Sequence, residues 1–248
     1  MKINPVIETL LNHRSIRKFK DQALTEKQIR ILVESAQAAS TSSYTQSYSI
    51  IGVDDPKIKK QLRAIASDQA YVEQNGCFFV FVADQYRNKM IGETSGESTA
   101  VLNTTQRLLV ALGDACFAAQ NMAVAAESMG LGICYIGSIQ NDIDKTSEIL
   151  HLPDFAFPFF GMAVGYPDQH PEKKPRLPFA AIYHHNRYNP APDQNSLKAY
   201  DQRVADYYRM RTGGQREETW TSQIADGLGR PYRKALKPYL ERHHLGLR

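Results

Sequence analysis

Apolar and polar residues follow each other along the first part of the chain in patterns that predict two helices and two strands. A capping-box sequence, TEKQ, precedes apolar residues at helical spacing, which predicts a helix over 25–38. Two short runs rich in Ile, Val and Phe, at 48–53 and 77–83, predict buried strands. Between them, Pro56 stands where a first helical turn would begin, so we expect a short helix over 56–66.

The next part of the chain carries one long apolar helix and two more strands. Residues 108–129 have small or apolar side chains on nearly every face, which predicts a central buried helix that Gly130 caps. Apolar runs at 132–137 and 157–165 predict two further buried strands. A helix over 144–150 is expected to separate them.

The other segments are more polar. Residues 85–100 carry two glycines and predict a surface excursion. Six prolines between positions 166 and 192 predict an extended path, and the strongly charged remainder has helical stretches interrupted by glycine and proline. We therefore expect a single domain over 1–248, with the excursion at 85–100 and an extended and helical arm over 166–248.

Composition limits the class of protein. The 248 residues are 42% hydrophobic, enough to bury a core, and the formal net charge of +4 is too small to predict a nucleic-acid partner. The N-terminal stretch is broken by Pro5 and Glu8 and lacks the apolar centre of a secretory signal. The longest apolar region contains Asp114 and Glu127, which a membrane-spanning helix would not tolerate without cause. We expect a soluble cytoplasmic protein.

The cysteines and histidines show no metal-binding or redox pattern. Cys77, Cys116 and Cys134 lack C-x-x-C spacing and each sits among apolar residues, which favours buried reduced thiols over a nucleophile or a metal ligand. The histidine pairs at 184–185 and 243–244 are adjacent, so their side chains would diverge. We expect them at the surface and predict no metal site.

A basic segment at 13–19, HRSIRKF, is the first candidate for binding an anion. In an extended chain it would send Arg14 to one face and His13, Ser15 and Arg17 to the other. Several donors that converge on one anion suit a phosphate, because charge-assisted, forked hydrogen bonds are strong. A solvated basic turn explains the segment, taken alone, equally well.

A second basic cluster, KKPRLP at 173–178, contains prolines that fix the directions of Lys174 and Arg176 relative to each other. An ordinary surface loop is the alternative. The presence of two such clusters, each beside a predicted core element, favours one shared anionic ligand.

Two uncharged segments are further candidates. Residues 135–138, YIGS, end a predicted strand with a glycine whose backbone could approach a flat ligand closely. Residues 40–46 follow the first core helix and offer hydroxyl and amide donors. A tight turn and a polar helix-end loop are the respective alternatives. The chain has no G-x-G-x-x-G, Walker or Ser-His-Asp pattern.

Together and in this order, these segments resemble the oxygen-insensitive NADPH nitroreductases and NADPH-dependent FMN reductases of the nitroreductase superfamily. The resemblance covers essentially the whole chain, and HRSxR near the start with KPRLP past the middle is its most specific pair. The other matching elements are TSS at 41–43, ESMGLG at 127–132, YIG at 135–137 and TW at 219–220.

The resemblance implies an α+β fold with a central, mostly antiparallel sheet flanked by helices, and an intertwined homodimer with one FMN at each of two interface sites. Residues that match contacts of the FMN phosphate and ribityl end are His13, Arg14, Ser15, Lys174 and Arg176. Residues that match contacts along the flavin ring are Arg17, Gln69, Tyr135, Ile136, Gly137 and Ser138. Residues that match contacts from the other subunit are Ser42, Ser43 and Gln46.

The resemblance gives Arg17 a catalytic role. It matches the cation near flavin N1 and O2, where negative charge collects when a hydride reaches N5. Arg211 and Arg216 match positions that hold NADPH or NADH, and the preference between these two donors stays open.

The activity implied by the resemblance is an FMN-dependent NAD(P)H oxidoreductase that reduces nitroaromatics, quinones or free flavin by a ping-pong hydride relay. One alternative is a flavoprotein with a specialised physiological acceptor. Another is a non-catalytic module that binds anions or nucleic acid, favoured by the interleaved Tyr and Arg at 207–211 and disfavoured by the small net charge.

Overall fold

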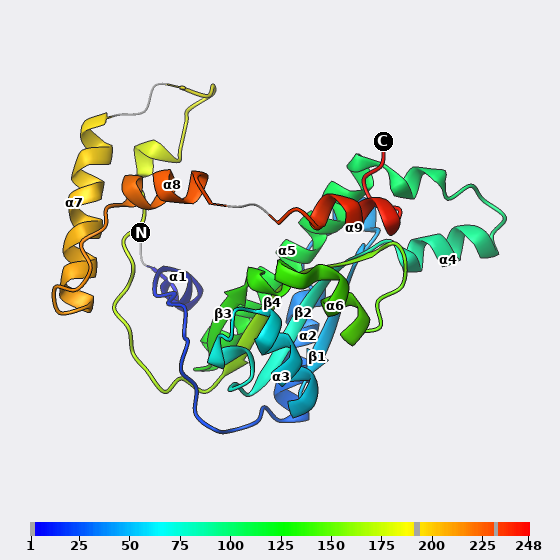
Figure 1. Ribbon diagram of the computed structural model, residues 1–248, viewed down its shortest axis with the longest axis horizontal. Coiled ribbons are helices and arrows are strands. Elements are labelled where there is room, and N and C mark those ends of the chain that lie inside the picture. The colour runs from blue at the N-terminus through cyan, green and yellow to red at the C-terminus, as the bar shows by residue number, and fades with distance from the viewer. Residues whose placement is uncertain (1–2, 191–193, 231–232) are drawn as a thin grey trace. The chain divides into compact units, whose positions relative to one another are not determined.

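The computed structural model describes residues 3–190, 194–230 and 233–248 (Figure 1). The chain divides into two compact units. The core unit consists of the described residues up to His170 together with Arg233–Arg248, and the arm unit consists of those within Pro171–Tyr232.

The core unit is built on a four-stranded sheet in the order β1-β2-β4-β3. The strands are β1 (Tyr48–Val53), β2 (Cys77–Asp84), β3 (Gly132–Ile136) and β4 (Ala156–Gly165). All neighbouring strands are antiparallel. β2 is buried over its whole length, because it is paired on both edges and covered on both faces. The structure thus confirms the predicted strands and the antiparallel α+β architecture.

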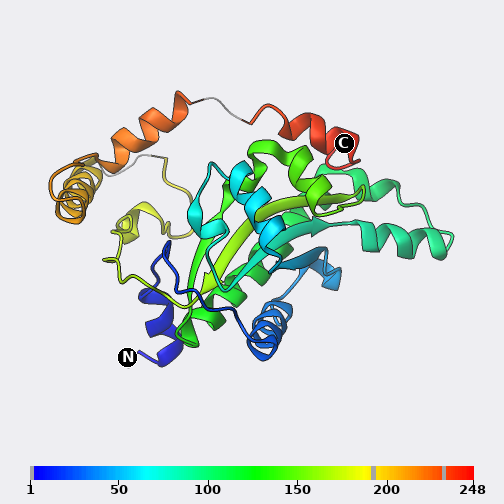
Figure 2. The same cartoon turned by 60° about the horizontal axis from the view of Figure 1, so that its bottom comes forward.

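Helices cover both faces of the sheet (Figure 2). α2 (Glu26–Gln37) and α5 (Thr105–Ser128) pack against the odd-numbered residues of β2, and α3 (Pro56–Ile65) packs against the even-numbered ones. This division follows from the two-residue repeat of a strand. The predicted capping box at Thr25 is present at the start of α2, which fixes where that helix begins.

The other helices of the core unit are α1 (Pro5–Leu11), α4 (Tyr86–Thr94), α6 (Ile143–Ile149) and α9 (Leu236–Arg242). α4 lies in the segment expected to be a surface excursion and has no buried residue. In α9, Tyr239 is fully buried, accepts a hydrogen bond from Ser147 and donates one to the carbonyl of Ala156. The C-terminal helix is therefore tied into the core unit by apolar burial and by satisfied polar groups.

The segment 15–20 runs along the edge of the sheet at β3. Ser15 forms a parallel bridge to Ile133, and the amide of Ile16 donates to the Ile133 carbonyl at 2.8 Å. Ile16 packs directly on Gly132, where an added Cβ would lie 2.5 Å from the Ile16 Cγ1. Phe19 is buried and forms an antiparallel bridge to Pro167. The basic segment is thus held as an extended element, so its side chains alternate in direction.

One helix, α5, is long and apolar enough by composition to cross a membrane. In the structure its alanines pack against the sheet, and its Asp114 is 1% exposed. α5 is thus a core helix of the unit, as predicted, but the expectation of burial on nearly every face is wrong for the side that carries Leu109, Cys116 and Phe117, which is exposed in the single chain.

The arm unit contains α7 (Gln194–Arg211) and α8 (Trp220–Leu228). Its apolar cluster is small and aromatic, formed by Tyr200, Val204, Tyr207 and Tyr208, with Leu177 and Trp220 packed against it. A few aromatic rings thus hold the proline-rich segment against α7.

Close packing in the sheet gives a test of the fold. A Cβ at Gly161 of β4 would overlap the ring of Phe78, whereas a Cβ at Gly52 of β1 would lie at an ordinary 3.8 Å from Cys77 Sγ. We expect Gly161→Ala to lower the free energy of unfolding by about 1–3 kcal/mol, as overpacking a core does. Gly52→Ala should change it by less than about 1 kcal/mol. Urea unfolding followed by circular dichroism measures both, and equal stability of the two variants would contradict this packing.

Candidate functional site

Arg17, Gln69 and Ser138 come together beside the end of β3. Gln69 follows α3, and its Nε2 donates to Ser138 Oγ at 2.6 Å and to the Ala66 carbonyl at 2.8 Å. Tyr71 donates its hydroxyl proton to Gln69 Oε1 and interacts with the Arg17 guanidinium. Burial and the nearby Cys134 raise the pKa of Tyr71, while Arg17 acts in the opposite direction. Tyr71 is thus a neutral donor that links Arg17 to Gln69, and the sequence analysis did not identify it.

The backbone at the end of β3 is open to approach. Apart from Gly137 itself and its two chain neighbours, no atom of the described residues lies within 4 Å of the position that a Gly137 Cβ would take. Ile136 is buried under α3, whereas Tyr135 points to the other face, with its ring against Phe160 and its hydroxyl 3.4 Å from Gln120 of α5. The four residues at 135–138 therefore do not share one face, because they alternate along a strand.

His13 and Arg14 have partners away from the Arg17 group. His13 Nδ1 lies 2.6 Å from Glu127 Oε1, and Arg14 Nη1 lies 2.6 Å from His170 Nε2. Arg14, Glu127 and His170 line a cavity of about 550 Å³. The Nε of Arg14 is buried and has no hydrogen-bond partner in the described structure. A buried donor without a partner is costly, so Arg14 is suited to an additional acceptor.

The loop at 41–47 contains Ser42, Ser43 and Gln46 and is held by Asp114 of α5. The Asp114 carboxylate accepts the backbone N–H of Ser42 at 2.9 Å and that of Ser47 at 3.0 Å. In the sequence, Asp114 is recognisable only as a polar interruption of an apolar helix. A buried acid must have donors around it, so its presence there was the available signal.

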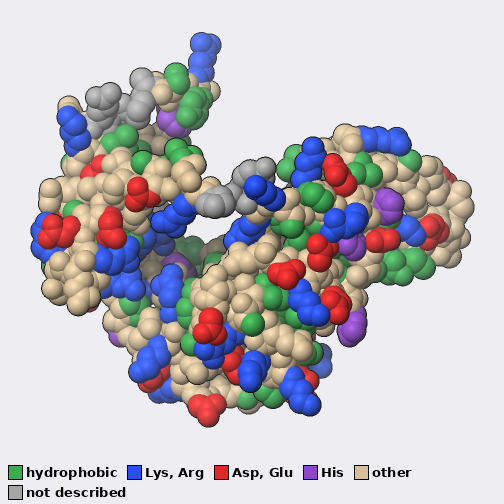
Figure 3. Space-filling view, in the orientation of Figure 1, with side chains coloured by type: hydrophobic (Ala, Val, Ile, Leu, Met, Phe, Trp, Pro, Cys, Tyr) green, Lys and Arg blue, Asp and Glu red, His purple; other side chains and the backbone are tan. Residues whose placement is uncertain are grey.

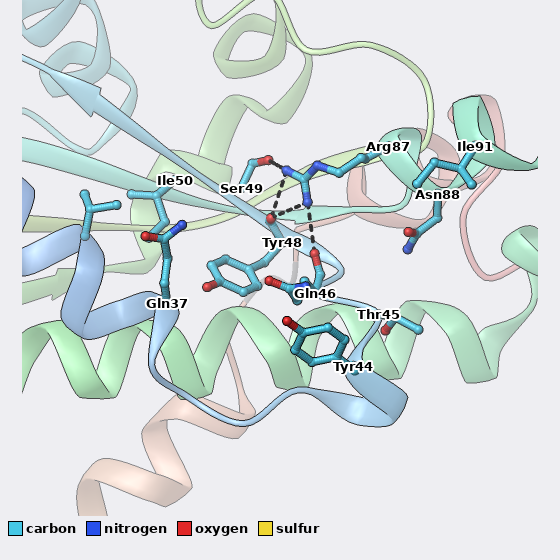
Figure 4. A pocket seen from close by; sticks show the side chains of 11 residues that line it. Gln37, Tyr44, Thr45, Gln46, Tyr48, Ser49, Ile50, Arg87, Asn88 and Ile91 are labelled. Atoms are coloured by element: carbon cyan, nitrogen blue, oxygen red, sulfur yellow. Dashed lines mark hydrogen bonds between the residues drawn. The ribbon is translucent and has the colours of Figure 1, made fainter. Parts of the chain in front are cut away.

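Arg87 of α4 supports the same loop from its other side (Figure 4). Its Nη1 donates to the Gln46 carbonyl at 3.0 Å, and its Nη2 donates to Ser49 Oγ at 2.9 Å. A cavity of about 610 Å³ lies here, with Tyr44 and Gln46 in its lining. Sequence reasoning missed Arg87, which stands in the segment predicted only as an excursion.

In the arm unit, Lys174 and Arg216 share one aromatic ring. The Lys174 Nζ lies 5.3 Å, and the Arg216 Cζ 4.3 Å, from the centroid of Tyr208. Arg211 donates to the hydroxyl of Tyr207 at 3.0 Å. Tyr208 thus positions Lys174, which is predicted to contact the FMN phosphate, and Arg216, which is predicted to hold NADPH or NADH, by cation–π contacts. Tyr207 positions Arg211, the other residue predicted to hold NADPH or NADH.

Five of the predicted cations carry no ion pair within the described residues: Arg14, Arg17, Lys174, Arg176 and Arg211. In contrast, Arg63, Arg87, Arg209, Arg216 and Arg242 each lie beside a carboxylate, for example Arg63 with Glu73 at 3.0 Å. Cations without a carboxylate partner are available for an anionic ligand.

No group of three or more possible metal ligands occurs among the described residues. Cys77 and Cys134 are buried free thiols, as expected, but Cys116 is exposed. The prediction of a buried thiol is wrong for Cys116, because it lies on the side of α5 that also carries the exposed Phe117, away from the sheet. Apolar neighbours in the sequence do not reveal which face of a helix is buried.

Comparisons with known proteins match the whole architecture. Residues 10–166 match the model of the nitroreductase family, and residues 174–248 match the nitroreductase family C-terminal domain. The FMN reductase (NADPH) of Bacillus subtilis strain 168 is 53% identical over 242 residues, which cover 96% of this chain and 97% of that protein.

Solved structures agree with these matches. The NfrA1 nitroreductase from B. subtilis is 52% identical, with a TM-score of 0.95 over 98% of this chain and 100% of that one. The NADPH:FMN oxidoreductase from Vibrio harveyi complexed with NAD+ is 37% identical, with a TM-score of 0.90 over 99% of this chain and 100% of that one.

The chemistry of Cys77 can be tested directly. Burial raises the pKa of Cys77 to about 11, so at pH 8 its thiolate fraction is about 100-fold lower than at the ordinary value of 9.0. We expect iodoacetamide at pH 8 to alkylate Cys77 at least that much more slowly in the native protein than in urea. Peptide mass spectrometry measures the rates, and similar native and unfolded rates would show that Cys77 is accessible as a nucleophile.

Proposed function

The chain belongs to the nitroreductase family, and we propose that it reduces free flavin, nitroaromatics or quinones by a ping-pong relay of electrons from NADPH or NADH. It is an NAD(P)H-dependent oxidoreductase that uses FMN. The observation that carries the proposal is the grouping of Arg17, Gln69 and Ser138 beside the open backbone of Gly137. A cation, an amide and a hydroxyl around exposed backbone suit one edge of a planar flavin.

The chain's residues fit the two ends of FMN. For the phosphate end, the buried Nε of Arg14 offers a donor without a partner, and we propose that His13, Ser15, Lys174 and Arg176 complete the phosphate contacts. For the ring, we propose contacts from Arg17 and Gln69, together with the backbone of Tyr135, Ile136, Gly137 and Ser138 at the end of β3. In FMN, the ribityl chain separates the phosphate from the flavin ring. Arg14 and Arg17 have different neighbours in the core unit, which agrees with their binding opposite ends of the cofactor.

Bound FMN supplies the redox chemistry, since it takes a hydride from NAD(P)H and returns electrons to an acceptor. The protein contributes position and charge. Arg17 holds a positive charge that Tyr71, kept neutral by its raised pKa, does not cancel. We propose that this charge stabilises the reduced flavin and that Arg17 is the catalytic residue.

We propose that the active enzyme is a homodimer, in which Ser42, Ser43 and Gln46 contact the FMN of the other subunit. Exposed apolar side chains on α5 support this, because Leu109 is 63% and Phe117 57% exposed in the single chain. Large apolar side chains gathered on one face favour an interface with a second copy.

Membership of the nitroreductase family excludes the non-catalytic alternative, since the chain is an enzyme. Figure 3 also shows Lys and Arg interspersed with Asp and Glu on the visible face of the core unit, which suits no extended polyanion.

A specialised physiological acceptor remains compatible with the same site, because an open flavin face accepts many planar oxidants. We further propose a cytoplasmic enzyme, where thiols such as Cys116 stay reduced.

The proposed function predicts a yellow protein. After reconstitution with FMN and dialysis, the visible spectrum should show bound flavin, and anaerobic addition of NADPH should bleach it. Air, a quinone or a nitroaromatic added afterwards should restore the colour. A colourless protein that retains no FMN would contradict the proposal.

The role of Arg17 can be separated from simple binding. We expect Arg17→Ala to slow flavin reduction by NADPH about 100-fold, comparable to the loss of one preorganised charge-stabilising donor, and to weaken FMN binding much less. Lys18→Ala is a matched control, because Lys18 is the next cation in the chain and pairs with Asp168 at 3.1 Å. Stopped-flow absorbance gives the rates, and equal rates for Arg17→Ala and the unaltered enzyme would remove Arg17 from catalysis.

We propose that Arg211 and Arg216 hold the nicotinamide dinucleotide, with Arg216 at the 2'-phosphate of NADPH. Arg216→Ala should then raise KM for NADPH about 10- to 100-fold, the cost of one hydrogen bond to a charged group, and leave KM for NADH nearly unchanged. Arg209→Ala is the control, since Arg209 pairs with two carboxylates, Asp206 and Glu217, whereas Arg216 pairs with Glu218 alone. Steady-state kinetics with both donors decide this, and a parallel rise for NADH would argue against a phosphate contact.

A further inference from the structure

The loop at 41–47 has an unusual backbone. Ser43, Tyr44 and Gln46 have φ values of 50°, 58° and 48°, all in the left-handed region. Each such non-glycine residue costs about 1–2 kcal/mol. Three of them within four residues persist only where surrounding contacts hold the chain, and such strain often accompanies functional sites.

Asp114 holds the two ends of this loop. One carboxylate oxygen accepts the N–H of Ser42 and the other accepts the N–H of Ser47. Asp114 is 1% exposed, so these hydrogen bonds are shielded from water and are strengthened by the charge. One side chain from α5 thus fixes the distance between the entrance and the exit of the loop.

Arg87 holds the carbonyl groups on the opposite side. Figure 4 shows its guanidinium directed at the carbonyls of Gln46 and Tyr48 and at the Ser49 hydroxyl. Asp84 joins this network, since one of its oxygens accepts from Ser49 Oγ at 2.5 Å and lies 3.5 Å from Arg87 Nη2. The forked geometry of arginine allows all of these contacts at once, which a lysine cannot reproduce.

We propose that Asp114 and Arg87 act together as positioning residues for the flavin site: they hold the loop at 41–47 so that Ser42, Ser43 and Gln46 present their polar groups to the FMN bound by a second copy of the chain. The inference rests on the proposed function, because that function supplies the flavin and the dimer. Asp114 takes the loop's N–H groups and Arg87 satisfies its carbonyls, so neither side chain needs to touch the flavin.

The hydrogen bonds by which Asp114 and Arg87 hold the loop can be tested without measuring enzyme activity. In FMN-free protein, hydrogen–deuterium exchange should show a protected peptide over residues 41–49. We expect this peptide to exchange about tenfold or more faster in Arg87→Ala and in Asp114→Asn, with peptides of β2 unchanged. Lys89→Ala is the matched control, because Lys89 belongs to the same helix α4 and pairs with Glu93. Unchanged exchange at 41–49 in both Arg87→Ala and Asp114→Asn would overturn the proposal.

The link to the flavin is tested by FMN affinity, measured from the quenching of FMN fluorescence on binding. We expect the Kd for FMN to rise about tenfold in Arg87→Ala, with partial rescue in Arg87→Lys, and to stay the same in Lys89→Ala. A chain in which Ser42, Ser43 and Gln46 are all replaced by Ala should show no further loss when Arg87→Ala is added, because interacting residues are not additive. A full additional loss in that background would overturn the positioning role.

The two proposals can fail separately. If the unaltered protein bound no FMN, the proposed function would be wrong, and the positioning role with it. If the unaltered protein bound FMN and Arg87→Ala loosened the loop with no change in FMN affinity, only the positioning role would be wrong.

Discussion

The hydrogen bond from the Ile16 amide to the Ile133 carbonyl is the contact on which the site depends. It aligns the basic segment with β3, and the absence of a side chain at Gly132 lets Ile16 seat against the strand. An extended segment fixed in this way sends successive side chains in opposite directions. Arg14 is thereby directed to the cavity shared with Glu127, while Arg17 is directed to Tyr71 and Gln69.

Hydrogen bonds to the backbone also fix the charged side chains that are buried or half-buried in the core unit. Asp114 is tolerated in the central helix because two backbone N–H groups satisfy it, and Arg87 is oriented by backbone carbonyls and by Asp84. In contrast, Arg17 keeps its charge without a carboxylate partner in the described structure. The fold therefore satisfies the charges of Asp114 and Arg87, which hold a loop, and leaves Arg17, to which we assign a role in electron transfer, without a carboxylate partner.

The sequence predicted the core well, because the strands and α2 carry strong periodicity and a capping box. It could not predict α4, since that helix buries no residue and leaves no apolar pattern. Nor could it reveal the exposure of Cys116, or that Tyr71 and Gln69 meet Arg17, because such contacts depend on the tertiary fold. The resemblance named Arg17 and Gln69 separately, and only the structure joins them through Tyr71.

The most direct test of the account is a crystal structure of the protein with bound FMN. The account predicts the Arg17 guanidinium within hydrogen-bonding distance of the flavin N1 and O2 edge, with Gln69 and Ser138 beside the ring and the phosphate at Arg14. A flavin ring bound away from Arg17, or a phosphate that Arg14 does not contact, would contradict the central claim that the basic segment holds both ends of the cofactor.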